Sequence, residues 1–166
     1  MFMKITHLIP VLAVALFTSC APAPHDASVS TPQQLASESA AALNAKDYAK
    51  AQTLAPQATS IDPKFAEAWV GYGMASVRLG QADQARAAYE QALSLHQARH
   101  RKNPSDATQV VQQVFLLTLL GRSADAEALL KQAHTDYPTD QTITWLAGDF
   151  TKTKQGWQSW VVEAKP

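Results

Sequence analysis

Residues 66–95 decide the fold, and they read AEAWVGYGMASVRLGQADQARAAYEQALSL. Apolar and small residues recur there at spacings of three and four, first at Trp69, Tyr72, Gly73, Ser76 and Leu79 and then at Ala85, Tyr89, Ala92 and Leu93. Such spacings are typical of amphipathic helices. Gly80 stands between the two runs and is suited to end the first helix in the left-handed conformation. The stretch therefore predicts two antiparallel helices joined by a short turn.

Small side chains mark the places where these two predicted helices should touch. Gly73, Ala85 and Ala92 add no bulk to the helix surfaces, and nearby aromatic rings can fill the space opposite them. The pattern resembles a tetratricopeptide repeat in the run Trp69–Tyr72–Gly73, then Leu79–Gly80, then Ala85, Tyr89 and Ala92. That resemblance implies an all-α fold, a right-handed α-solenoid of antiparallel helix pairs that offers an extended binding surface.

The same signals recur before and after this pair. The repeat length of the family is 34 residues. At this distance before Trp69, Ala85 and Ala92 stand Leu35, Ala51 and Ala58. Stepping forward from Gly80, Ala85 and Ala92 reaches Gly121, Ala126 and Ala133, a distance of 41 residues. The difference is about two helical turns. We expect it to lengthen the helix that ends near residue 102.

Both ends of the repeat region carry their own signals. Thr31 and Pro32 suit the cap and the first position of a helix. A further helix is expected over 141–154, where Gly148 matches the position of Gly73. Trp157, Trp160 and Val161 are suited to cover the apolar end of a solenoid. The fold prediction is therefore about 3.5 tetratricopeptide-like repeats over 31–164, at about 31–65, 66–106, 107–140 and 141–164.

The first thirty residues predict export and a lipid anchor. Residues 1–19 carry a positive charge near the start, at Lys4, and then an apolar run that is too short to cross a bilayer. This arrangement is typical of a signal peptide. Leu16–Cys20, LFTSC, resembles a bacterial lipobox, with Phe17 as a departure from the usual aliphatic residue. The alternative is an unmodified cysteine. Residues 20–30 read as a flexible tether.

The resemblance to bacterial lipoproteins also predicts a location. The modified cysteine would become the N-terminus and carry the acyl chains, so Cys20 is the predicted lipidation site and the contact with the membrane. Ala21 and Pro22 follow it, with no acidic residue directly after the cysteine. By resemblance this favours the outer membrane of a bacterial cell envelope, with the domain facing the periplasm.

Several functions are disfavoured by the sequence. The formal net charge is +0, so no basic surface for nucleic acid is expected. Cys20 is the single cysteine, which rules out an intrachain disulfide and a zinc site built from cysteines. His96 and His100 share a helical face, but cationic neighbours favour a solvated basic helix end over a metal site. Neither a nucleophile–base pair nor a phosphate loop stands out, so we expect no enzyme activity and no cofactor.

The resemblance also implies a binding site, because the first helix of each pair lines the concave groove of such a solenoid. The repeat register places these residues there: Leu43, Asn44, Val70, Met74, Val77, Arg78, Val111, Phe115, Thr118 and Trp145. They are mostly apolar, which favours an extended or helical peptide as the ligand. The carboxylate clamp of some relatives is missing, since its positions hold Ala36, Ala40, Val70, Gly71 and Met74.

These features together predict a non-enzymatic protein–protein interaction module, a lipid-anchored adaptor or assembly factor of the envelope. Its expected partner is a protein or peptide. Two alternatives stay open: a structural lipoprotein that associates with itself as a homo-oligomer, and an accessory subunit of an envelope enzyme. The functional part of this prediction depends on the family resemblance alone.

Overall fold

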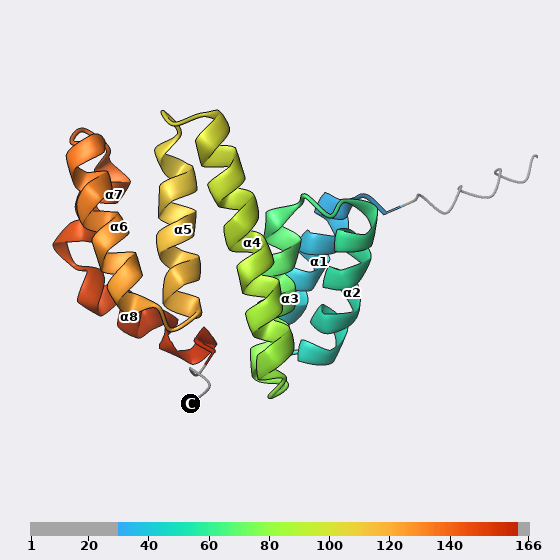
Figure 1. The fold of residues 1–166 in the computed structure, drawn as a ribbon. Helices are drawn as coiled ribbons and strands as arrows, with labels where there is room; N and C mark the ends of the chain where they lie inside the picture. The colour runs from blue at the N-terminus through green and yellow to red at the C-terminus, as the bar shows by residue number, and fades with distance from the viewer. Residues whose placement is uncertain (1–29, 163–166) are drawn as a thin grey trace, which may run out of the picture.

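The computed structural model describes residues 30–162, and the regular elements in that range are helices (Figure 1). They are α1 (Pro32–Asn44), α2 (Tyr48–Ile61), α3 (Ala66–Arg78), α4 (Ala82–Lys102), α5 (Ala107–Leu119), α6 (Ser123–Asp136), α7 (Gln141–Gly148), α8 (Phe150–Trp157) and the 3-10 helix η1 (Gln158–Trp160). The predicted signal peptide and Cys20 lie outside the described residues. Within residues 30–162, none of the helices combines the length and apolarity needed to cross a membrane.

Local signals set the ends of the helices as expected. Thr31 caps α1: its hydroxyl accepts a hydrogen bond from the Gln34 backbone N–H, and the Gln34 side chain accepts one from the Thr31 N–H. Gly80 and Gly121 follow α3 and α5 with φ values of +73° and +74°. Glycine is favoured there because other residues rarely adopt this backbone conformation. The prediction for Gly80 is confirmed.

The longer repeat step appears as a longer α4. This helix has 21 residues, whereas α2 and α6 have 14 each. Its last turns reach back to the turn before α3, where Arg99 donates a hydrogen bond of 2.8 Å to the carbonyl oxygen of Lys64. The same guanidinium lies 3.4 Å from the carboxylate of Glu67. The last turns of α4 therefore stabilise the start of α3, the first helix of the same repeat.

The largest apolar core runs from α4 through α5 and α6 to the C-terminal segment. Ala85 and Ala92 lie in it with 0% exposed surface, which confirms the predicted tight contacts. Leu116, Leu119 and Ile143 are among its largest fully buried side chains. Two smaller clusters, built mainly from alanines, hold α1 and α2 against α3. Contacts also join each helix from α1 to α7 to the next one along the chain.

The helices of the second and third pairs balance their side-chain volumes at equivalent positions. A Cβ atom added at Gly73 would lie 2.3 Å from Cε1 of Tyr89, whose side chain is fully buried. In the third pair the equivalent positions hold Val114 and Leu130, and both are buried. A bulkier residue on the first helix thus goes with a smaller residue on the second.

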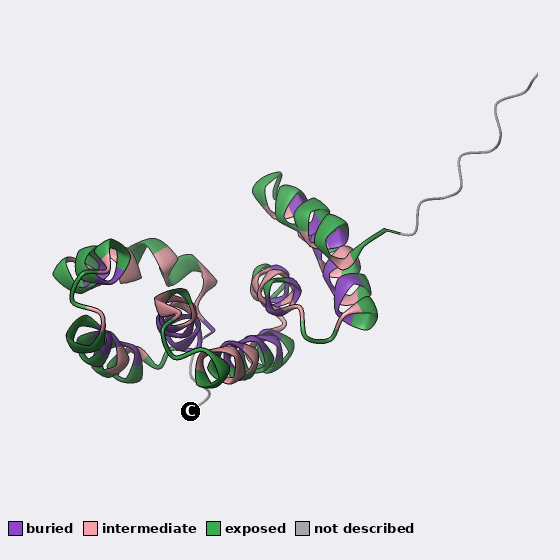
Figure 2. Ribbon diagram, turned by 90° about the horizontal axis from the view of Figure 1, so that it is seen from above, coloured by how far each residue is buried: buried purple, intermediate pink, exposed green. Residues whose placement is uncertain are grey.

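The C-terminal part differs from the expected single helix over 141–154. The helix is broken between α7 and α8 at Asp149, where φ is −141° and ψ is 40°. Glycine at position 148 weakens the helix at this point. The Asp149 carboxylate makes no cap hydrogen bond to α8 and accepts one from Lys152 instead. Gly148 has open space at its Cβ position, so it does not repeat the contact of Gly73. After α7 the chain turns back towards the middle of the molecule (Figure 2).

Candidate functional site

The inner face of the solenoid is the side formed by the first helices of the pairs, α1, α3, α5 and α7. Contacts join α1 to α3 and α5 to α7 along this face. Five of the predicted groove residues, Val70, Met74 and Val77 of α3 and Val111 and Phe115 of α5, are partly buried and pack against the main core. Each of them therefore combines a packing role with some remaining surface.

The ends of this face are more open. Trp145 on α7 is a large apolar side chain that is 64% exposed. Asn44 and Arg78 are also exposed, and Leu43 is partly buried against the first helix pair. Trp145 is therefore the predicted groove residue that another molecule could bury with the least rearrangement.

Thr118 is a correction to the predicted groove. Its side chain is 1% exposed, and its hydroxyl donates a hydrogen bond of 2.9 Å to the carbonyl oxygen of Val114. The reason is that the last turn of α5 is covered by the end of the chain: the backbone N–H of Val162 donates to the carbonyl oxygen of Leu119 at 2.8 Å. Thr118 therefore has no free surface for a partner.

The C-terminal segment, residues 150–162, lies on the inner face. The rings of Trp157 and Phe115 meet edge to face, with centroids 4.9 Å apart and an interplanar angle of 78°. The guanidinium of Arg78 stacks over Trp160 at 4.1 Å from the ring centroid. In addition, α8 contacts α5 and η1 contacts α3. The segment therefore joins the second and third repeats across the face predicted to bind a partner.

A buried tyrosine fixes the middle of this segment. The hydroxyl of Tyr89 donates a hydrogen bond of 3.1 Å to the carbonyl oxygen of Trp160. Burial raises the pKa of Tyr89 well above its usual range, so the hydroxyl stays protonated and keeps donating. Trp160 was expected to cover the end of the solenoid, together with Trp157 and Val161. The sequence signal missed the location of these side chains because the repeat pattern gives no packing partner for residues after 154.

His96 also differs from its predicted surroundings. The side chain is 3% exposed, not solvated, and its Nδ1 lies 2.9 Å from Oε1 of Gln109. The amide nitrogen of Gln109 donates to Asp106, so its oxygen faces the ring and accepts from it. Burial, first of all, lowers the pKa of His96. Within residues 30–162 no group of three or more His, Cys, Asp or Glu could hold a metal ion.

We expect acid to destabilise the fold through His96. Because burial lowers its folded-state pKa below the usual value of about 6.5, the unfolded chain binds this proton more readily. The contribution is present at neutral pH and is lost as the pH falls below about 6.5 towards the lower folded-state value. The melting temperature should drop by roughly a few degrees between neutral pH and pH 5. In His96→Gln this slope should be shallower, whereas His134→Gln, at an exposed position, should keep it.

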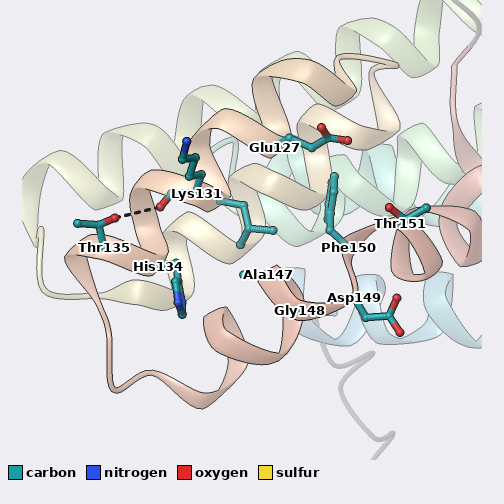
Figure 3. Close-up of a pocket in the computed structure, with 10 residues that line it drawn as sticks. Glu127, Lys131, His134, Thr135, Ala147, Gly148, Asp149, Phe150 and Thr151 are labelled. Carbon is teal, nitrogen blue, oxygen red and sulfur yellow. Dashed lines mark hydrogen bonds between the residues drawn. The ribbon is translucent and has the colours of Figure 1, made fainter.

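An open pocket of about 550 Å³ lies between α6 and the break that separates α7 from α8 (Figure 3). One stripe of α6 lines it together with the junction: Glu127, Leu130, Lys131, His134, Thr135, Ala147, Gly148, Asp149, Phe150 and Thr151. The hydroxyl of Thr135 donates to the carbonyl oxygen of Lys131, and Glu127 pairs with Lys154 at 3.3 Å. These side chains do not converge on a reacting group, so the pocket gives no sign of catalytic chemistry.

The helix pairs and their inner face define the class of the protein, an all-α repeat protein of the solenoid type. The family model for the tetratricopeptide repeat matches residues 42–102, which hold all of α2, α3 and α4. Residues 42–102 are therefore tetratricopeptide-like, as the sequence pattern indicates. Repeats of this kind are typically protein-interaction modules.

Comparison with solved structures gives a chain of the "CopN-Scc3 complex", with 20% sequence identity and a TM-score of 0.48. The similarity covers 74% of this chain and 68% of that chain. Comparison with curated proteins gives no match.

Proposed function

We propose that the chain is a non-enzymatic adaptor or assembly factor of a bacterial envelope, which binds a peptide segment of a protein partner with its inner face. The supporting observation is that Trp145 on α7 is 64% exposed and that apolar side chains of α3 and α5 are only partly buried. The repeat register assigns these residues to the same face. A few large side chains supply most of the energy of such an interface.

The envelope location in this proposal comes from the first twenty residues. The apolar run and the lipobox-like LFTSC predict export and acylation of Cys20. The cysteine precedes α1 by about a dozen residues, so the anchor and the inner face belong to the same short chain. The partner would then be a protein that reaches the same membrane surface.

Replacing Trp145 with alanine should weaken partner binding by about tenfold, or roughly 1.4 kcal/mol, because an exposed indole that a partner buries is a typical hot spot. The fold should be unaffected, since the side chain is already 64% exposed. The measurement is the yield of partner captured by a photo-crosslinking residue at position 74, compared between the parent and Trp145→Ala in cells.

Ile61→Ala is the matched control, because Ile61 is 52% exposed on α2, outside the predicted groove. It should leave the yield unchanged. Equal loss in both variants, or no loss in Trp145→Ala, would contradict the inner face as the partner site. Recovery of the chain itself as the crosslinked species would support the self-associating alternative instead.

A further inference from the structure

We propose that the inner face between α3 and α5 is a binding site for a peptide with two large aromatic residues three positions apart, followed by extended apolar residues, and that the chain's own C-terminal segment occupies this site until a partner displaces it. The proposal rests on the proposed function, and it adds the chemistry of the partner and a competition for the site. The contacts of residues 150–162 carry it.

The two tryptophans of the segment contact two different side chains on the inner face. Trp157 meets Phe115 of α5 edge to face, at 4.9 Å between ring centroids. Trp160 lies under the guanidinium of Arg78 of α3, at 4.1 Å from its ring centroid. Residues three apart lie on one side of a helical turn, so a single turn presents both rings at once. The site therefore selects aromatic rings at this spacing.

The end of the segment is held through its backbone. The carbonyl oxygen of Trp160 accepts a hydrogen bond from Tyr89, and the N–H of Val162 donates to Leu119 at 2.8 Å. Val161 is extended, with φ −71° and ψ 134°. Val161 and Val162 line a small cavity of about 250 Å³ beside Val77, Gly80 and Ala82. Backbone bonds of this kind do not depend on the peptide's sequence, so a foreign segment could make them as well.

The middle of the segment is held less firmly than its ends. Trp157, Trp160 and Val161 are only partly buried, and Gln155, Gly156, Gln158 and Ser159 between or beside them are exposed. Phe150 and Val162, at the two ends, are buried in the main core, so the middle is the part that a partner displaces first. The connection to α7 passes through the break at Asp149. A tethered segment competes at a high effective concentration, in the millimolar range for short linkers. A partner must therefore outcompete it, and the free site is available only when the segment is released.

The test uses a fluorescent peptide of residues 149–162 and the chain without its predicted signal peptide. In the chain variant Trp157→Ala/Trp160→Ala, the internal segment loses both rings and should vacate the site. Fluorescence anisotropy should then show the peptide binding this variant at least about tenfold more tightly than it binds the parent chain. Trp160→Ala alone, a milder change, should give an intermediate gain if the double variant proves unstable.

Three controls define the site. The same peptide carrying Trp157→Ala and Trp160→Ala should not bind. Adding Phe115→Ala to the vacated chain should remove the gain. Adding Tyr137→Ala to the vacated chain should keep the gain, because this change removes a partly buried ring after α6, bonded to Pro104, that the segment does not contact through a ring pair. Equal binding to parent and vacated chains, binding to neither, or binding that ignores Phe115 would each overturn the proposal.

The crosslinking test of the proposed function and the peptide-binding test of the internal segment can be contradicted independently. Loss of peptide binding combined with a crosslinked partner that still depends on Trp145 would reject the internal occupant and keep the proposed function. Specific peptide binding combined with Trp145-independent crosslinking would keep the aromatic site and reject the proposed partner surface.

Discussion

Replacing Gly73 with valine should lower the free energy of unfolding by about 3 kcal/mol, because the added atoms overpack a closed contact. Even a single Cβ would stand 2.3 Å from Cε1 of Tyr89. Tyr89 has no exposed surface and donates a hydrogen bond to the Trp160 carbonyl, so its ring cannot move aside freely. Urea denaturation followed by circular dichroism would measure the loss.

A second change should rescue much of this loss. The third repeat holds valine and leucine, Val114 and Leu130, where the second holds Gly73 and Tyr89. Tyr89→Leu alone should cost about 2 kcal/mol through the space it leaves. In Gly73→Val/Tyr89→Leu the valine fills that space, so the double variant should lose at least about 1 kcal/mol less than the sum of the single losses. Additive losses would show that the two residues do not compensate each other.

Replacing Cys20 with alanine should move the protein from the membrane fraction to the soluble fraction. Stable attachment needs more than one acyl chain, and the modified cysteine is the predicted carrier. Fractionation of cells and labelling with a fatty-acid analogue would measure the effect.

Phe17→Leu is the matched control for the anchor. It replaces the one lipobox position that departs from the usual pattern with the usual residue, and it keeps Cys20. This variant should be labelled and membrane-bound at least as well as the parent. Membrane attachment of Cys20→Ala, or an unlabelled parent, would contradict the lipoprotein prediction.

The fold was largely predictable because helix pairing leaves local marks in the sequence. The spacing from Trp69 to Leu93 indicates two helices and Gly80 gives the turn, and the 41-residue step predicts the long α4. The repeat register alone then assigned candidate residues to the inner face. These signals depend on neighbours within one repeat, so they need no knowledge of distant contacts.

The rest depends on contacts that are far apart in sequence. The hydrogen bond between Tyr89 and Trp160 joins residues that are 71 positions apart. The periodicity of the sequence does not indicate it. The burial of Thr118 follows from the same return of the chain. His96 is buried because Gln109 of the next helix meets it, although its neighbours in sequence are cationic and polar. The sequence pattern of one helix does not show which residue of another helix will contact it.

The volume balance between paired helices limits how this chain could be recombined. A chimera that joins α5 to α4 in place of α3 would set a valine against Tyr89, where even an alanine finds no room. The opposite chimera, α3 with α6, would set a glycine against Leu130 and leave a void. The first pair uses a third solution, Ser39 with Ala55, in which the serine hydroxyl donates to the Ala51 carbonyl. The unit that can be exchanged or duplicated intact is therefore the whole hairpin, and single helices are not interchangeable parts.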